Sequence, residues 1–473
     1  MKNELEMVIG LEIHAELKTA TKIFCGCSTA FGAEPNTQCC PVCTGMPGAL
    51  PVLNREVVHL AALAGLAMNC RISRHSVQDR KNYFYPDLPK AYQISQYDRP
   101  LCEGGWLDIE TEGGAKRVGI TRIHIEEDAG KLIHRPEGTL VDCNRCGVPL
   151  IEIVTEPDLR SAAEVRAFLT KLRAILLYTG VSDCKMNEGS LRCDVNLSVR
   201  PRGEQKLGTR TEMKNLNSFQ FIGRAIEYEF QRQAGELAAG RDIVQETRRF
   251  DEKSGKTFSM RRKENADDYR YFPDPDLPPI EITEQELAQW QGELPVLPDE
   301  RKARYVGQFG LSAYVAEQLT ASRTVADYFE QAAALTAAPK TVAGLLLTEV
   351  PRLMEPGSET IPVAPQRMAA LADMLARGDV SSGAGKTVLG ALWKQDGDPR
   401  ALAETLGLLQ ISDEQTLWPV VQAVVGQNPK AADDWRHGRQ AALQSLVGQC
   451  MKQTRGRGNP TVLQALLKRA LEQ

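Results

Sequence analysis

The stretch Met7-Val8-Ile9-Gly10-Leu11-Glu12-Ile13-His14 decides how the first part of the chain folds. Its aliphatic and β-branched residues predict a strand. Side chains alternate between the two faces of a strand, so Glu12 and His14 point to the same face. The sequence therefore predicts a sheet in which one strand carries a carboxylate and an imidazole side by side.

Three more stretches have the composition of strands, namely residues 118–125, 149–154 and 193–199. Helical stretches interrupt them. One begins at Ser161, which forms a predicted capping box with Glu164, and another covers residues 218–237. Strands mixed with helices in this way favour the α+β class, with a β-rich domain first.

Changes in composition divide the chain further. Proline-rich breaks at residues 272–279 and 294–298 end the β-rich region. Because 473 residues are too many for one compact core, we predict three domains. They are a β-rich domain (1–295), a helical domain (296–405) and a small helical tail (406–473).

The charge of the chain limits how it can meet nucleic acid. The formal net charge is −4, whereas a protein that contacts RNA along its whole surface is normally basic. Any RNA must therefore contact local patches. One candidate is the turn at residues 454–460, where Arg455 and Arg457 are predicted to be exposed and to contact a phosphate backbone. A solvated loop without a ligand is the alternative.

The chain has no predicted membrane segment. No apolar run approaches the roughly 20 residues that span a bilayer, and residues 1–6 are too acidic for a secretory signal. We therefore expect a cytoplasmic protein whose 12 cysteines are not a disulfide framework. Of these, Cys143 and Cys146 have no partner pair nearby and are expected to pack in the interior.

Four other cysteines fall into two close pairs. Cys25 and Cys27 are followed by Cys40 and Cys43 after a short loop. Two such pairs supply four thiolates that can close tetrahedrally on Zn²⁺, and a site of this kind is structural because it has no open position. The alternatives are a set of reduced structural thiols, or a zinc site in which Cys39 replaces Cys40.

Carboxylates also occur in the apolar strands, where they are costly unless they are paired or bound to a metal. The candidates on or beside these strands, with one imidazole, are Glu12, His14, Glu126, Glu127, Asp128, Glu152 and Asp194. Carboxylates with an imidazole suit Mg²⁺, the usual partner of ATP phosphates. Each residue taken singly fits a structural role, and the sequence does not show that the strands converge.

Two stretches have features of nucleotide or RNA binding, and we expect only the first of them to bind. The run at residues 79–90 mixes aromatic and basic side chains and offers Lys81, Tyr83, Tyr85 and Lys90 as contacts to a base or ribose. A rigid loop packed by its own aromatic rings is the alternative. Residues 383–387 look like the end of a phosphate-binding P-loop but lack its first glycine, so we expect no such loop there.

These stretches together resemble the B-subunit family of bacterial glutamyl/aspartyl-tRNA amidotransferases. The resemblance runs in order along essentially the whole chain. It is carried by residues 10–14, 31–36, 80–93, 121–131, 149–158, 185–194, 214–219, 267–273 and 446–449.

The resemblance implies a fold and a site. It implies a β-rich cradle domain with kinase and transamidase activity, then a helical domain, then a tail that contacts the tRNA body. ATP would phosphorylate the side-chain carboxylate carried by the tRNA, and ammonia would then displace phosphate. The positions that match the Mg²⁺ ligands of the family are Glu12, His14, Glu127, Glu152 and Asp194, with Glu127 favoured over Glu126. Some members also carry the four-cysteine zinc site.

The resemblance also implies partners in a heterotrimer. The expected substrate is misacylated Glu-tRNA(Gln), Asp-tRNA(Asn) or both. A glutaminase subunit would release ammonia from glutamine, a channel would carry the ammonia into the cradle, and a small third subunit would wrap the pair. Two rival functions stay open from the residues themselves, a zinc-stabilised tRNA scaffold without chemistry and an ATP-dependent ligase for a small metabolite.

Overall fold

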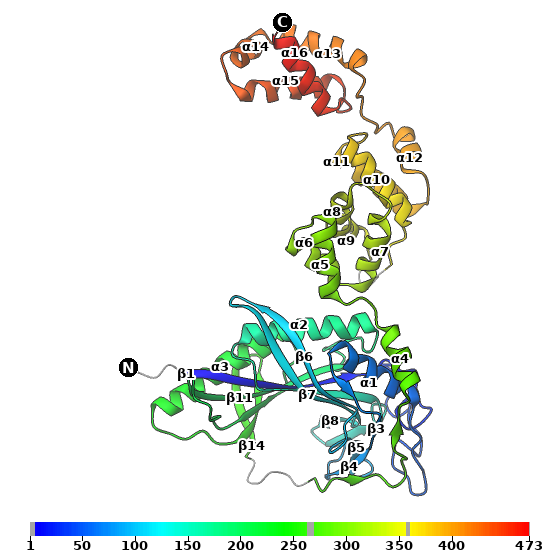
Figure 1. The fold of residues 1–473 in the computed structure, drawn as a ribbon, viewed down its shortest axis with the longest axis vertical. Coiled ribbons are helices and arrows are strands. Elements are labelled where there is room, and N and C mark those ends of the chain that lie inside the picture. Colours follow the sequence, from blue (N-terminus) through cyan, green and yellow to red (C-terminus); the bar gives the residue numbers. More distant parts are fainter. Residues whose placement is uncertain (1–4, 263–268, 356–359, 473) are drawn as a thin grey trace. The chain divides into compact units, whose positions relative to one another are not determined.

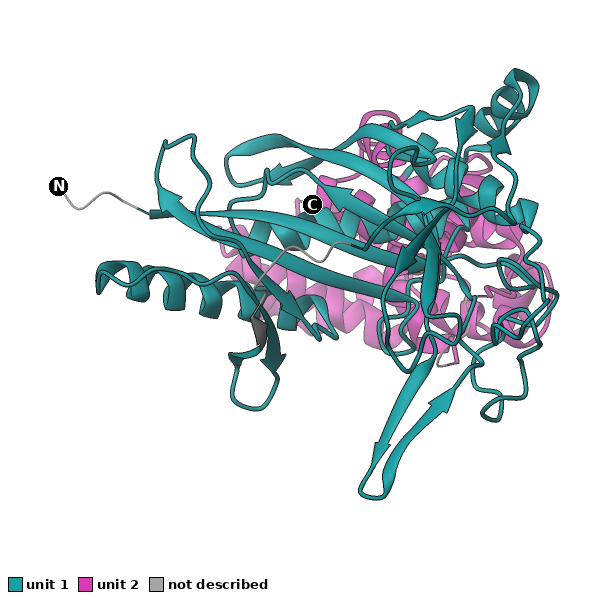
Figure 2. Ribbon diagram, turned by 90° about the horizontal axis from the view of Figure 1, so that it is seen from below, with its two compact units in different colours: residues 1–297 teal, residues 298–473 magenta. Residues whose placement is uncertain are grey.

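A computed structural model describes residues 5–262, 269–355 and 360–472. Residues 1–4 of the acidic N-terminus, and residues 267 and 268 of one block that carries the resemblance, lie outside the described residues. The chain divides into two compact units, residues 1–297 and 298–473 (Figure 2). The first holds the strands and the second is helical, so the predicted α+β class is confirmed (Figure 1).

The first unit is built on one large sheet. Its strands, within the described residues and in spatial order, are β14 (Lys256–Arg262), β13 (Glu246–Asp251), β12 (Thr211–Lys214), β11 (Leu191–Pro201), β1 (Leu5–Glu16), β10 (Pro149–Thr155), β7 (Gly114–Glu127), β6 (Cys102–Thr111) and β2 (Arg71–Ile72). All neighbours pair antiparallel except β12 and β13, which run parallel. The opening stretch of the sequence therefore lies at the centre of the sheet.

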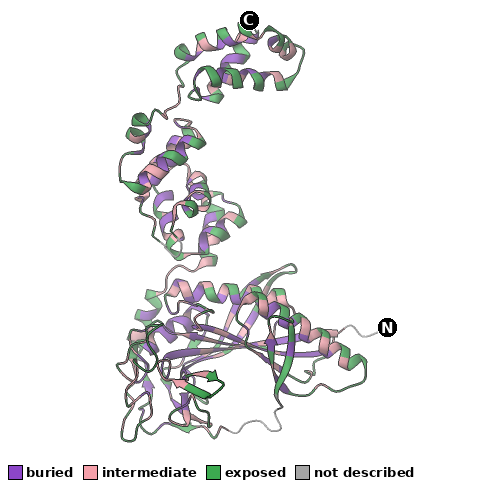
Figure 3. Cartoon of the chain, turned by 180° about the vertical axis from the view of Figure 1, so that it is seen from behind, coloured by how far each residue is buried: buried purple, intermediate pink, exposed green. Residues whose placement is uncertain are grey.

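The core of this unit covers one face of the sheet. In β1, Ile9, Leu11 and Ile13 are buried, while Glu12 and His14 alternate with them and are half-buried. Buried residues of three helices belong to the same core (Figure 3). The helices are α1 (Arg55–Ala67), α2 (Ala162–Thr179) and α3 (Phe219–Ala238). This alternation leaves the opposite face of the sheet to polar side chains.

Helix α2 shows how local sequence fixes an element. Ser161 Oγ accepts a hydrogen bond from the Glu164 amide at 3.1 Å, which is half of the predicted capping box. The Glu164 carboxylate accepts from the Arg160 amide at 2.7 Å and pairs with Lys116. The helix ends at Gly180, whose φ of 73° lies in the left-handed region that glycine adopts without strain.

Smaller elements complete the first unit. They are a sheet of β15 (Phe272–Pro273), β4 (Asp79–Asn82) and β5 (Tyr92–Ser95); the pair β16 (Ile280–Glu281) and β3 (His75–Ser76); the hairpin of β8 (Lys131–Arg135) and β9 (Gly138–Asp142); and α4 (Glu284–Glu293).

The secondary-structure elements that the structure describes in the second unit are all helices, joined by turns and two isolated β-bridges. It contains α5 (Pro298–Phe309), α6 (Ala313–Thr320), α7 (Arg323–Ala333), α8 (Pro339–Thr348), α9 (Val350–Leu353), α10 (Pro365–Arg377), α11 (Ser382–Lys394), α12 (Pro399–Thr405), α13 (Glu414–Gln427), α14 (Pro429–Arg436), α15 (Gln440–Gln453) and α16 (Pro460–Glu472). Its buried residues form two separate clusters, one between residues 305 and 403 and one between 417 and 471. The domain boundary at 405/406 stays a prediction.

Two further expectations concern this unit and the whole chain. Residues 383–387 lie in the first turns of α11, and the element before it is the helix α10 rather than the strand that precedes a P-loop. Among the described helices, none has both the length and the apolar character that crossing a membrane requires.

Candidate active site and cysteine cluster

The polar face of the sheet brings two groups of acids together. Strand pairing sets His14 opposite Glu152 and, in the next strand, Glu152 opposite His124. His14 Nε2 lies 3.3 Å from Glu126 Oε1 and 3.6 Å from Glu152 Oε2. His124 Nε2 lies 3.2 Å from Glu152. His14, Glu126 and Glu152 thus form one candidate cation site, with ligand atoms within 4.8 Å of one another.

The second group lies on the same face one strand further. Glu12 is paired with Asp194, and with Glu212 these residues place carboxylate oxygens within 4.8 Å of one another. Lys214 Nζ lies 3.0 Å from Glu212 and also pairs with Asp194. Asn196 donates to Glu12 Oε1 at 2.9 Å. In this group an ammonium stands among three carboxylates, so the group accommodates a positive charge.

Glu127 lies apart from both groups. It continues the series of Ile123 and Ile125 on the opposite face of β7, whereas Glu126 continues the series of His124. The Glu127 carboxylate pairs with Lys90 and accepts a hydrogen bond from the Ile94 amide at 2.9 Å. The structure therefore places Glu126, rather than the favoured Glu127, beside His14 and Glu152. The alternation of apolar and polar residues at 123–127 predicts that Glu126, and not Glu127, shares a face with His124.

Mutual charge shifts the protonation of the first group. Burial by itself lowers the pKa of His14, but the hydrogen bond with Glu126 and the charge of Glu152 raise it to about 9. Burial raises the pKa of Glu152, but the neighbouring His124 and His14 lower it, and the net pKa is about 2. Burial and the nearby carboxylates Glu152 and Glu212 raise the pKa of Glu12. The first group is therefore a partly buried set of opposite charges, and in the second Glu12 holds its proton more tightly than usual.

An open pocket lies over these residues. His14, Glu126 and Asp194 line it together with basic and polar side chains. Those are Lys81, Tyr83, Arg192, Lys214, Asn215 and Asn217. The pocket thus presents fixed cations beside the acidic groups, an arrangement that suits an anionic ligand held together with a metal ion.

The four residues proposed as contacts, of which Lys81 lies in β4, separate in space. Lys81 lines the pocket with its ammonium 4.9 Å from the ring centre of Tyr269 and 5.8 Å from that of Tyr83. Tyr83 lines the pocket too, but Tyr85 is exposed and is not part of the lining. Lys90 lines a different pocket, together with Lys22, Cys43 and Glu127. Two of the four therefore stand where a ligand of the acidic pocket would contact them.

Residues that the sequence reasoning missed complete the site. They are His124 in the long strand β7 and Glu212 and Lys214 in the short strand β12, each at an alternate position of its strand. Arg192 lies 2.7 Å from Asp128 and lines the same pocket. The alternation of residues 211–214 was a usable signal, but the strand is only four residues long and therefore easily overlooked.

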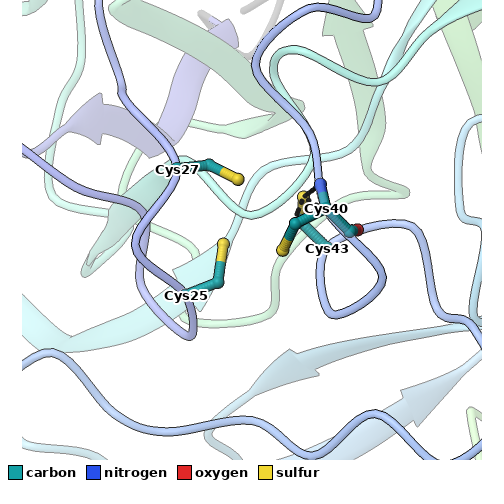
Figure 4. A group of neighbouring side chains, drawn as sticks. All are labelled: Cys25, Cys27, Cys40 and Cys43. Carbon is teal, nitrogen blue, oxygen red and sulfur yellow. Dashed lines mark hydrogen bonds between the residues drawn. The ribbon is translucent and has the colours of Figure 1, made fainter.

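The four paired cysteines meet as expected (Figure 4). The sulfurs of Cys25, Cys27, Cys40 and Cys43 lie within 4.8 Å of one another. The Sγ atoms of Cys40 and Cys43 are 4.0 Å apart. Tetrahedral zinc with bonds of about 2.3 Å requires sulfurs roughly 3.8 Å apart. The donor set therefore fits zinc with only small adjustments.

The surroundings of the cluster decide between the alternative cysteines. Cys39 Sγ is 3.3 Å from the Asn36 carbonyl oxygen and is not a member of the group, so Cys40 fills the fourth position. Cys143 and Cys146 both lie outside the group, and Cys146 is buried as expected whereas Cys143 is only half-buried. The hydrogen bond from Cys25, which outweighs burial, lowers the pKa of Cys43 to about 4.

The turn predicted in the tail, which carries two arginines, follows α15 in the structure. Arg455 and Arg457 are both exposed, and Arg455 has a φ of 52°. The hydroxyl of Thr454 accepts a hydrogen bond from the Gly458 amide at 3.0 Å and holds the turn in shape.

The chain matches two protein-family models and several proteins of known name. Residues 7–288 match the model described as "GatB/GatE catalytic domain", and residues 327–471 match the model described as "GatB domain". Three aspartyl/glutamyl-tRNA(Asn/Gln) amidotransferase B subunits are similar along their whole length. The protein of Caldicellulosiruptor saccharolyticus is 54% identical (99% of each chain), that of Carboxydothermus hydrogenoformans 52% (98% of each) and that of Geobacter sulfurreducens 50% (99% of each).

The fold and the pocket define the class first: a catalytic domain that presents acids and bases on the open face of a sheet, joined to a helical unit. Within that class the chain belongs to the family of aspartyl/glutamyl-tRNA(Asn/Gln) amidotransferase B subunits. The family resemblance read from the sequence is confirmed.

Proposed function

We propose that this chain amidates misacylated Glu-tRNA(Gln), Asp-tRNA(Asn) or both, with ATP as the source of activation. The observation that carries the proposal is the pocket in which two acidic groups face the ammonium groups of Lys81 and Lys214. A pure tRNA scaffold has no need of buried carboxylates in the centre of a sheet, because burial of such groups is costly. The full-length similarity to named amidotransferase proteins supports the same assignment.

The chemistry requires activation of a carboxylate. Hydroxide is a poor leaving group, so ammonia does not displace it from a free carboxylate. Transfer of the γ-phosphoryl group of ATP to the carboxylate of the tRNA-bound side chain releases ADP. Attack by ammonia on that carbon then forms the amide and releases phosphate.

The residues of the pocket have distinct tasks in this scheme. His14, Glu126 and Glu152 would hold one Mg²⁺, and Glu12, Asp194 and Glu212 a second. When bound, Mg²⁺ neutralises phosphate charge and fixes the orientation of the phosphates.

Basic side chains of the pocket act on the phosphates. Lys81, Lys214 and Arg192 line the pocket as fixed cations that attract phosphate oxygens. The rings of Tyr83 and Tyr269 hold the ammonium of Lys81 in place.

The remaining parts of the chain have supporting roles in the proposal. Zn²⁺ in the cysteine cluster is structural, because all four positions are taken by thiolates. Arg455 and Arg457 contact the tRNA backbone. Ammonia comes from a partner glutaminase, and a small third protein completes a heterotrimer in the cytoplasm.

The test uses the assembled enzyme. The heterotrimer of this chain, the glutaminase and the small third protein is mixed with charged tRNA, ammonium, Mg²⁺ and γ-labelled ATP, and phosphate release and amide formation are followed. Both are expected to require charged tRNA and to be lost in Glu12→Gln, while tRNA binding stays within about twofold. Tight tRNA binding without any use of ATP would identify a scaffold. Turnover of a free amino acid without tRNA would identify a small-molecule ligase.

A further inference from the structure

A lysine without an acidic partner lies beside the cysteine cluster. Lys22 is 0% exposed. Its Nζ is 3.6 Å from Cys43 Sγ and 3.2 Å from the Cys143 carbonyl oxygen. Within the described part of the chain no carboxylate lies within ion-pair distance of this ammonium. Lys22 and Glu127 both line the pocket that contains Lys90, and the Glu127 carboxylate is paired with Lys90.

An ammonium at the buried position of Lys22 is stabilised by a nearby anion. The carbonyl oxygen of Cys143 accepts a hydrogen bond from it but carries no net charge. The sulfur of Cys43 is the contact that can supply a negative charge. Four thiolates around a divalent cation carry a net charge of −2, so one ammonium offsets half of the charge of the loaded cluster.

The second contact of Lys22 ties the cluster to the main sheet. Cys143 begins a turn that runs to Gly147, whose amide donates to the Asp128 carbonyl oxygen at 2.9 Å. Asp128 in turn holds Arg192 of the acidic pocket at 2.7 Å. Lys22 therefore touches both a cysteine of the cluster and the turn that supports one edge of the pocket.

We propose that Lys22 is a positioning residue whose ammonium is the counter-charge of the metal-loaded cysteine cluster. The inference rests on the proposed metal function of that cluster. The ammonium donates an N–H···S hydrogen bond to Cys43 and adds a fixed positive charge beside it. Both lower the electron density on this thiolate and stabilise the negative charge of the four thiolates around the bound cation. Groups that support metal ligands in this way typically change metal affinity by about 10- to 100-fold.

The test compares Lys22→Met, which keeps the length of the side chain but removes the charge, with Lys22→Arg, which keeps the charge. Lys18→Met is the matched control, since Lys18 is an exposed lysine four residues away. Zinc affinity is measured on the full chain by competition with a chromophoric chelator. Lys22→Met is expected to bind zinc about 10- to 100-fold more weakly, Lys22→Arg more tightly than Lys22→Met, and Lys18→Met like the unaltered chain.

A spectroscopic readout separates this role from a purely structural one. In the cobalt-substituted protein, loss of the positive charge raises the energy of the thiolate electrons, so the thiolate-to-cobalt charge-transfer band is expected to shift to longer wavelength in Lys22→Met. Equal affinity and an unshifted band in Lys22→Met would overturn the role of Lys22 alone. An unaltered chain that binds neither zinc nor cobalt would overturn the cysteine site itself. Circular dichroism of the metal-free variants shows whether each is folded. If Lys22→Met does not fold, the comparison uses Lys22→Arg: zinc affinity tenfold or more below that of Lys18→Met would overturn the counter-charge role.

Discussion

Exchange of Glu126 for glutamine is expected to weaken the binding of Mg²⁺ in the acidic pocket. The substitution keeps the size of the side chain and removes one negative charge. Glu126 Oε1 lies 3.3 Å from His14 Nε2, and the Glu126 side chain is only 3% exposed. The charge is therefore poorly screened by solvent, and its loss acts at short range on whatever cation the site holds.

The magnitude follows from the charge that is lost beside the cation. A carboxylate and a unit of cation charge about 4 Å apart interact by about 4 kcal/mol at an effective dielectric constant of about 20. The polar amide and the solvation of the released cation offset part of this. We expect roughly 3 kcal/mol to remain, which corresponds to a loss on the order of 100-fold in Mg²⁺ affinity.

The neighbouring residue supplies the matched control. Glu127→Gln removes the same charge one position along the chain, but on the opposite face, where the carboxylate pairs with Lys90. It is expected to leave Mg²⁺ affinity within about threefold and to lower stability, because a partly buried ammonium loses its partner. Mn²⁺ titration followed by electron paramagnetic resonance measures affinity, and thermal melts measure stability. The Mg²⁺ dependence of tRNA-stimulated ATP hydrolysis is recorded for both variants.

One result would refute the reasoning. If Glu127→Gln weakens metal binding on the order of 100-fold and Glu126→Gln does not, the alternation of side chains along β7 has been assigned to the wrong faces.

Three further changes have defined outcomes. Gly208→Ala is expected to cost about 1–3 kcal/mol in urea unfolding, because its Cβ would meet the backbone of β11 far inside contact distance, whereas Gly235→Ala, with open space around it, is expected to be neutral or stabilising. Burial raises and hydrogen bonds from Ser259 and Arg248 lower the pKa of Glu246, and the net lowering means that this carboxylate stabilises the fold above its usual pKa of 4.5. That contribution is lost as the pH falls below about 4.5, so the stability difference from Glu246→Gln should shrink between pH 6 and pH 4, and a constant difference would contradict it. Stripping the metal from the cysteine cluster with a chelator should lower the melting temperature of the protein without changing Mg²⁺ affinity in the acidic pocket, and an unchanged melting temperature would argue against a structural metal.

Local patterns determined many of the elements correctly. Alternation in residues 7–14 placed Glu12 and His14 on one face, and the apolar spacing in the last two helices placed Leu446 and Leu467 in the core. The cysteine pairs also converge as their spacing indicated. These features depend on contacts between residues close in sequence, where the periodicity of a strand or helix decides which side chains share a face.

Only the tertiary structure decided which distant groups share a site. Residues as far apart as Glu12 and Glu212 meet because β1, β11 and β12 are hydrogen-bonded neighbours, and the order of strands in a sheet is set by long-range pairing. The same pairing set β7 beside β10 and so brought Glu126 to His14, and the fold of the chain placed Lys90 in another pocket. A sequence records the periodicity of each strand, but the energy that selects its neighbours arises only when the whole sheet and its core assemble.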